Sequence, residues 1–84
     1  MANTNWQWKG DKQLRYMLDD VCKCILRKDR IGPPPDKAFG WFLFDGDGER
    51  VLGGLNKDRQ VWRTTKQAAL EVAGKWLAGE EVQP

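Results

Sequence analysis

The segment Phe39–Leu52, with the sequence FGWFLFDGDGERVL, decides the fold of this chain because it predicts a β-hairpin. Its first part, Phe39–Phe44, is a dense aromatic run of strand length. Asp45–Gly48 alternates two residue types that favour tight turns, and Glu49–Leu52 can return beside the first strand. Two antiparallel strands are therefore expected at the centre of the fold.

Both faces of this hairpin are apolar. A loop over Asp45–Gly48 places Phe44 opposite Glu49 and Phe42 opposite Val51. The other face is bulkier, and we expect it to be the core; it carries Phe39, Trp41, Leu43 and Leu52. Helices on one side of a sheet cover one face only, so the face with Phe42 and Phe44 is left without cover.

A long helix is predicted before the hairpin. Apolar residues recur at helical spacing after Asp11, at Leu14, Met17, Leu18, Val21 and Ile25. Asp11 suits the N-cap position, and a polyproline turn at Pro33–Pro35 would end the helix after Gly32. The predicted helix is Asp11–Arg30.

A third strand and a second helix follow the hairpin. Arg59–Arg63 offers a short strand, and Thr64–Gln67 matches a capping box. The helix predicted after it, Thr65–Ala78, turns alanines, Val72 and Trp76 toward the sheet and stops at Gly79.

These elements predict an α+β fold of αβββα order, in which a three-stranded antiparallel sheet carries two helices packed on one face. The chain of 84 residues has room for one core, so residues 1–84 are expected to form a single domain. We expect an N-terminal arm at 1–10, a folded core at 11–78 and a solvated tail at 79–84.

The composition argues against an enzyme. The chain has no histidine and no serine, which excludes Ser/His and Cys/His nucleophile pairs. Its two cysteines, Cys22 and Cys24, are too few for a structural zinc site, and Asp45–Glu49 lacks the spacing of a calcium loop. We expect no cofactor and no metal. Without a spanning apolar run or a secretory signal, we also expect no membrane partner and a cytoplasmic location.

The first function hypothesis is a small non-enzymatic protein-binding module that masks or bridges a partner surface. The uncovered sheet face, with Phe42, Phe44 and Val51, is the candidate partner-binding site, either for another protein or for self-association. By analogy, a small domain of this kind resembles the accessory or inhibitor proteins of phages and mobile elements.

Nucleic-acid binding is the alternative hypothesis. The net charge is only +2, from 14 basic and 12 acidic residues, so binding would depend on local clusters. Placed on a helical wheel, one basic face of the first helix carries Lys12, Arg15, Lys23, Arg27 and Arg30. A second basic group, Arg59, Arg63 and Lys66, flanks the start of the last helix. Free backbone N–H groups there could hold a phosphate, which Arg63 and Lys66 could reinforce.

Trp6 and Trp8 precede the first predicted helix. Two roles are open for them: they close an edge of the core, or they anchor a partner. We favour closure of the core, because small domains recruit terminal aromatic residues to fill gaps.

The αβββα order and the start of the last helix, TTKQAALEVA at Thr64–Ala73, together resemble the double-stranded-RNA-binding domain. The resemblance covers most of Asp11–Ala78. It implies that Lys66 contacts a phosphate and that Lys12 and Arg15 lie on a groove-facing helix. The region from Phe39 to Ala78 also resembles the arm-binding domains of phage integrases.

Overall fold

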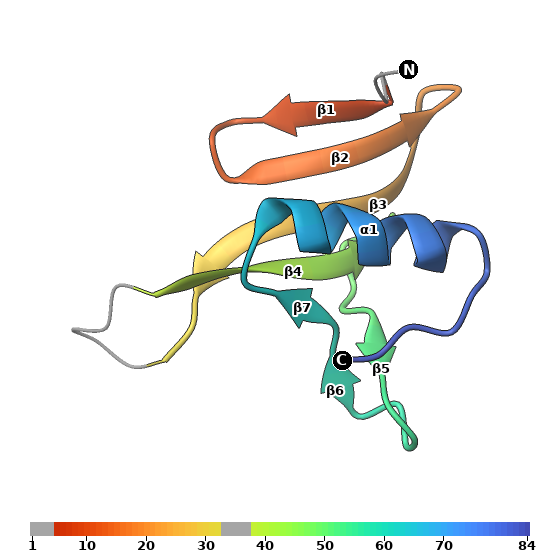
Figure 1. Cartoon of the computed structure of the whole chain (residues 1–84). Coiled ribbons are helices and arrows are strands. Elements are labelled where there is room, and N and C mark those ends of the chain that lie inside the picture. The colour runs from red at the N-terminus through yellow and green to blue at the C-terminus, as the bar shows by residue number, and fades with distance from the viewer. Residues whose placement is uncertain (1–4, 33–37) are drawn as a thin grey trace.

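The computed structural model describes residues 5–32 and 38–84. Five antiparallel strands form the main sheet, in the order β1-β2-β3-β4-β7 (Figure 1). Their bounds are β1 Trp6–Lys9, β2 Gln13–Leu18, β3 Val21–Arg30, β4 Phe39–Asp45 and β7 Trp62–Arg63. A separate two-stranded ribbon pairs β5, Leu52–Gly53, with β6, Arg59–Gln60, and one helix, α1, spans Lys66–Leu77.

The predicted αβββα fold, with three strands and two helices, is wrong. The segment Asp11–Arg30 is no helix: most of it forms the hairpin of β2 and β3. Its turn is Asp19-Asp20, where both residues have positive φ, 52° and 63°, as a type I′ turn requires. Aspartate tolerates this left-handed backbone better than most residues. The predicted proline turn at Pro33–Pro35 lies outside the described residues.

The alternation of buried apolar side chains with side chains on the opposite face explains why β2, β3 and β4 are strands. Leu14 on β2 lies opposite Leu26 on β3, and Leu26 lies opposite Leu43 on β4. All three side chains are buried, whereas their neighbours along each strand point to the other face. The αβββα order on which the RNA-binding-domain resemblance rests is therefore absent.

The β4 strand is present as predicted, but its return strand differs. Asp45 Oδ1 accepts the backbone N–H groups of Asp47 and Glu49, both at 2.9 Å, and so closes the turn. Phe44 then pairs with Arg50 in an isolated bridge, not with Glu49. The chain leaves the sheet soon afterwards, and Phe42 pairs with Trp62 of β7 instead of Val51.

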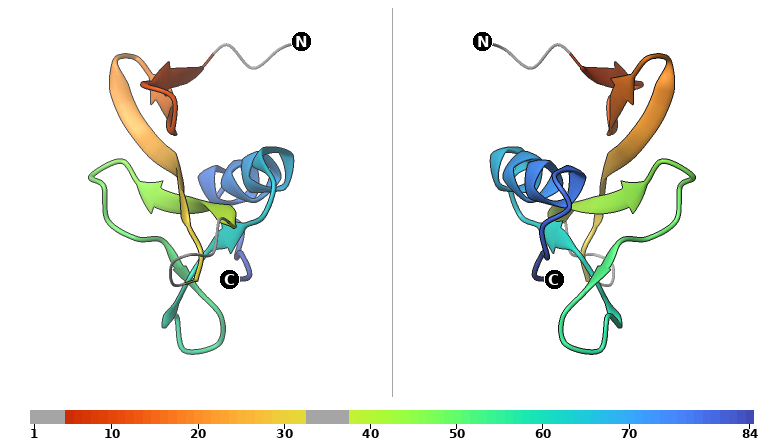
Figure 2. Two further views of the ribbon diagram at one scale, coloured as in Figure 1. Left: turned by 90° about the vertical axis from the view of Figure 1, so that its left-hand side faces the viewer. Right: turned by 90° about the vertical axis from the view of Figure 1, so that its right-hand side faces the viewer.

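The second predicted helix is present as α1. Its N-cap is Thr65, whose Oγ1 accepts the N–H of Ala68 at 3.2 Å. The helix packs on β3, β4 and β7 through Ala69, Val72 and Ala73, and the side views in Figure 2 show it on one side of the sheet. The small alanines let the helix lie close to the strands.

The core lies between α1 and the sheet. Of the four residues predicted on the core face, Trp41 and Leu43 are buried, but Phe39 and Leu52 are 39% and 42% exposed. Val61 and Val82 complete the core from either side. Most of the predicted tail is exposed, yet Val82 within it is buried. The predicted arm at 1–10 contains edge strand β1.

Candidate functional site: the open face of the sheet

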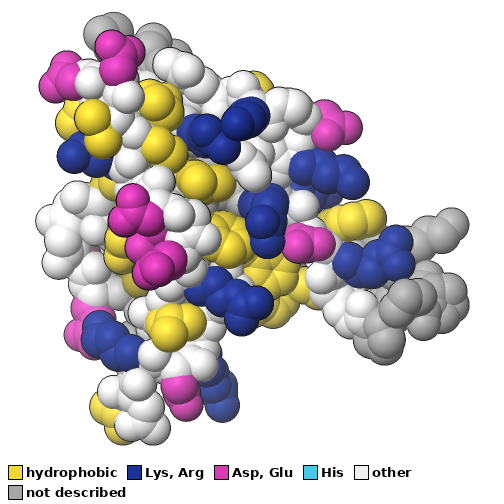
Figure 3. All heavy atoms as spheres, turned by 180° about the vertical axis from the view of Figure 1, so that it is seen from behind, with side chains coloured by type: hydrophobic (Ala, Val, Ile, Leu, Met, Phe, Trp, Pro, Cys, Tyr) yellow, Lys and Arg dark blue, Asp and Glu magenta, His cyan; other side chains and the backbone are white. Residues whose placement is uncertain are grey.

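No helix or strand among the described residues covers the face of the sheet that points away from α1. We call it the open face. Figure 3 views it directly: apolar side chains gather near its middle, and lysine and arginine side chains lie around them. Strand pairing places two cross-strand rows here. One row is Lys9, Gln13, Arg27, Phe42 and Trp62; its neighbour is Gln7, Arg15, Ile25, Phe44 and Arg50.

The aromatic part of the open face is a stacked pair. The rings of Phe42 and Trp62 lie 5.7 Å apart between centroids, with their planes 23° from parallel. Both residues are half-buried. Gly40 makes room for the pair, because a Cβ at this position would come within 2.9 Å of the Trp62 ring. The pair is therefore held in one place and keeps part of its ring surface in contact with solvent.

Arg27 lies beside this pair. Its guanidinium carbon is 4.5 Å from the centroid of the Phe44 ring, within the range of a cation–π contact. Its Nη2 also lies 3.6 Å from an oxygen of Asp29, in an ion pair whose two side chains are 47% and 58% exposed. Such an exposed pair contributes little to stability, so Arg27 can exchange it for another anion.

Arg15 is the second guanidinium on this face. Its Nε donates to Oε1 of Gln13 at 3.1 Å, which orients the side chain. This hydrogen bond uses the Nε donor of Arg15. It leaves the two terminal nitrogens of the guanidinium available to bind a ligand next to Ile25.

The three predicted partner-binding residues do not share one surface. Phe42 and Phe44 lie on the open face, with Phe42 half-buried and Phe44 only 7% exposed beneath Arg27. Val51 is equally buried, but it belongs to the core cluster beneath α1. Its N–H donates to the carbonyl of Leu43 at 3.1 Å, which places it at the edge of β4 and not opposite Phe42.

The predicted basic helix face does not exist, and its residues are dispersed over the β2–β3 hairpin and the turn before it. Arg15 and Arg27 meet on the open face. Lys12 lies in the β1–β2 turn, Lys23 is exposed near the bulge in the β2–β3 pairing, and Arg30 lies opposite Phe39 at the far end of β3.

Two members of the second basic group, Arg63 and Lys66, are already engaged within the protein. Arg63 donates to the carbonyl of Trp62 at 2.7 Å and to that of Gln83 at 3.0 Å. The Nζ of Lys66 lies 5.4 Å from the ring centroid of Trp8. These contacts hold the tail and the first strand against the body of the domain.

Sequence reasoning missed Trp62, Gln13 and Gly40 as parts of this face. The first two became visible only with the strand pairing. A glycine inside a strand was a usable signal, because it often marks a site of close approach by another group.

Cys24 offers no reactive thiolate. Cys24 is fully buried in the core, and burial together with the neighbouring Cys22 raises the pKa of its thiol to about 12. Both cysteines are free, and Cys22 Sγ donates to the carbonyl of Cys24. Within residues 5–32 and 38–84, no group of three or more His, Cys, Asp or Glu residues is placed to hold a metal ion.

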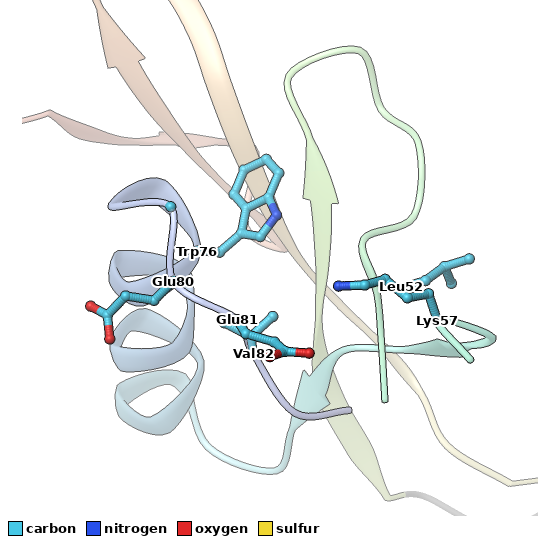
Figure 4. Close-up of a pocket in the computed structure, with 7 residues that line it drawn as sticks. Leu52, Lys57, Trp76, Glu80, Glu81 and Val82 are labelled. Carbon is cyan, nitrogen blue, oxygen red and sulfur yellow. The ribbon is translucent and has the colours of Figure 1, made fainter. Parts of the chain in front are cut away.

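Another hollow lies away from the open face, between the C-terminal end of α1 and β5 (Figure 4). It measures about 470 Å³ and is lined by Trp76, Leu52, Lys57 and the segment Gly79–Val82. It is an open depression where the tail crosses the domain, and its mixed charges favour no particular ligand.

Among the described residues, no helix is long and apolar enough to cross a membrane. No protein-family model, curated protein or solved structure matches this chain.

Proposed function

We propose that this chain is a non-enzymatic binding domain and that its open sheet face binds single-stranded nucleic acid. The observation that carries the proposal is the stacked Phe42–Trp62 pair with Arg27 beside it on the same cross-strand row. Single-stranded nucleic acids are bound by aromatic platforms that stack bases and by cations that track the phosphates. An antiparallel sheet can present both kinds of group on one surface.

The order of groups along the row suits this ligand. Phe42 and Trp62 offer apolar ring surface to a base, while Arg27, one strand away, offers a guanidinium to the phosphate beside that base. Lys9 lies further along the same row, and Arg15 lies in the neighbouring one. A strand that crosses the sheet along the row would therefore keep its backbone near positive charge.

The positive charge of the open face predicts that the affinity for single strands depends moderately on salt concentration. Of the four cations in the two rows, Lys9, Arg15 and Arg27 lie on β1, β2 and β3 and can each neutralise one phosphate, whereas Arg50 lies beyond the edge of β4. For single strands, the logarithm of the binding constant should then fall with the logarithm of salt concentration with a slope of about −2. In a duplex the bases are paired and stacked on one another, so their faces are not free to lie on the ring pair, and duplex binding should be weaker.

The test is a titration of fluorescein-labelled oligo-dT and oligo-rU with the protein, followed by anisotropy at two salt concentrations. We expect binding that is lost in Arg15→Gln/Arg27→Gln and in Phe42→Ala. Circular dichroism should show that these variants remain folded. Lys75→Gln is the control for loss of charge away from the open face: it removes one positive charge, against two in the double variant, from α1 on the opposite side. Equal loss in the control, or no binding to any single strand at low salt, would overturn the proposal.

A protein partner, or a second copy of this chain, is the second candidate function. The observation in its favour is the exposed apolar surface of the β5–β6 ribbon: Leu55 in its turn is fully exposed, and Leu52 at the other end of β5 is 42% exposed. Phe42 would then be part of an apolar contact that is insensitive to salt. Leu55→Asp should weaken such a contact and leave oligonucleotide binding unchanged. Sedimentation velocity checks self-association directly.

We also propose that the protein works in the cytoplasm. The support is the pair of free cysteines, Cys22 and Cys24, since reduced thiols are usual in that compartment.

A further inference from the structure

A pocket of about 300 Å³ lies on the open face, at the end next to the β4 turn. Ile25 and Phe44 form its apolar floor, Gln13, Arg15 and Arg27 line it from β2 and β3, and Asp47 lines it from the turn. Its volume is at the lower end of the range for small-molecule sites. It adjoins the ring pair, because Arg27 lines the pocket and also pairs with Phe42 across the strands.

The turn that carries Asp47 is held rigidly against the sheet. Asp45 accepts the backbone N–H of Asp47, as described above, and Gly48 N–H donates to the carbonyl of Asp45 at 3.1 Å. Gly46 packs directly on the backbone of Cys22, so closely that a Cβ there would overlap the carbonyl oxygen. The wall of the pocket is therefore preorganised.

Asp47 itself is not used by the fold. Its side chain has no hydrogen bond or ion pair within the part of the chain that the structure describes, although it lies at the rim of a pocket with two guanidinium groups. The carboxylate of Asp47 repels phosphate, so the pocket is poorly suited to a phosphate group alone. The pocket combines a carboxylate acceptor, guanidinium donors and an apolar floor.

We infer that this pocket holds one guanine base of the bound strand, an assignment that rests on the function proposed above. Guanine presents adjacent N1–H and N2–H donors to a carboxylate such as that of Asp47. It also presents the O6 and N7 acceptors that arginine recognises, here Arg15 or Arg27. Adenine and cytosine each offer an amino donor but lack this combination, and thymine has no amino group. The base would lie over Ile25, beside the guanidinium of Arg27 that covers Phe44, as unstacked bases do in single-strand sites.

The test compares oligo-dT nonamers with a single central dG, dI, dA or dC, measured by anisotropy on the full chain. The dG nonamer should bind at least about fivefold more tightly than the dA and dC nonamers. The dI nonamer, which lacks the 2-amino group, should lie between them. Asp47→Asn should remove the preference for dG while it preserves the affinity for oligo-dT. Asp58→Asn, a change of the same kind in the exposed loop before β6, should preserve both.

The outcomes separate the two proposals. Binding of all four nonamers with equal affinity, or a dG preference that survives Asp47→Asn, overturns the guanine assignment and leaves the single-strand proposal standing. No binding by any nonamer overturns both. Free guanosine monophosphate should compete weakly, because it lacks the stacking at Phe42; competition as strong as that of the dG nonamer would overturn the assignment to a base within a strand.

Discussion

The indole ring of Trp8 lies edge-on against the ring of Trp41, with centroids 6.0 Å apart and planes at 66°. Trp41 is buried beneath α1, so this contact ties the first strand of the sheet to the core. Trp6 makes a similar edge-on contact with Tyr16 at 5.2 Å and packs against the core cluster. The packing of Trp6 against the core cluster favours closure of the core, whereas Trp8 is an exposed residue whose role the contact alone does not assign.

Removal of either tryptophan should therefore change stability. We expect Trp6→Ala to lower the free energy of unfolding by about 2 kcal/mol, because its half-buried ring covers apolar core surface. Trp8→Ala should cost less, since Trp8 is 51% exposed. Urea denaturation measures both values. If both variants keep the wild-type midpoint and oligonucleotide binding falls, the two rings belong to the binding site.

Gly40 should not accept a side chain. An alanine Cβ would meet the Trp62 ring at 2.9 Å and Ile31 at 3.3 Å, so the ring must leave its stacked position on Phe42. We expect Gly40→Ala to destabilise the fold by about 1–2 kcal/mol and to change tryptophan fluorescence. Binding of oligo-dT should also weaken.

Gly74 provides the matched control for that substitution. It lies within α1 with open space around the position of a Cβ. Gly74→Ala should stabilise the protein by about 0.5–1 kcal/mol, because alanine has a lower entropic cost in a helix interior. A stabilising Gly40→Ala, or a destabilising Gly74→Ala, would contradict the packing described here.

The N-cap of α1 can be tested at two neighbouring threonines. Thr65 accepts the N–H of Ala68, whereas Thr64 is exposed and precedes the cap. Thr65→Ala should cost about 1 kcal/mol, and Thr64→Ala should stay within about 0.5 kcal/mol of wild type. Thermal denaturation of the two variants checks which residue caps the helix; the reverse order of effects would assign the cap to Thr64.

The raised pKa of the buried Cys24 thiol predicts how the stability of the protein changes at alkaline pH. Its thiol loses a proton near pH 9.0 in the unfolded chain but near 12 in the folded protein, because burial disfavours the thiolate. The unfolded state therefore loses its proton first, and stability falls as pH rises from about 9 to 12. The contribution is at most about 1.4 kcal/mol per pH unit.

The measurement compares wild type with Cys24→Ala over this pH range, because lysine and tyrosine groups also titrate there. The difference in unfolding free energy between the two proteins should shrink as the pH rises. At pH 8, an alkylating reagent should modify Cys22, which is half-buried, well before Cys24. Equal reaction rates at both thiols would show that the core opens readily.

Two elements could be predicted because their signals are local. The helix Lys66–Leu77 follows a threonine cap and ends before Gly79, and the strand Phe39–Asp45 ends in an aspartate–glycine turn. In both cases the residues that set the boundaries are close neighbours in sequence. The position of Phe42 and Phe44 on the face opposite Leu43 also follows from alternation alone.

The segment Asp11–Arg30 could not be assigned in this way. Its apolar spacing fits a helical stripe, yet in the structure the members of that stripe separate. Leu14 is buried in the core, Leu18 and Val21 are 44% and 52% exposed beside the turn, and Ile25 lies on the open face. A short apolar pattern can fit both the 3.6-residue period of a helix and the two-residue period of a strand. Pairing with other strands of the sheet selects between them.

The sequence by itself thus determined the helix after the two threonines, the turn and the alternation of β4, which depend on neighbouring residues. The predicted capping box at Thr64–Gln67 is displaced by one residue, because the N-cap is Thr65. Only the tertiary structure decided what lies beside β4. Its backbone groups need hydrogen-bond partners on both edges, and β3 supplies them along one edge from Cys24 to Arg30. On the other edge, burial of Val51 and Val61 brings Trp62 beside Phe42. Arg27 lies opposite Phe42, and Arg15 lies in the neighbouring row, for the same reason: pairing between strands, and not spacing along the chain, places them on one face.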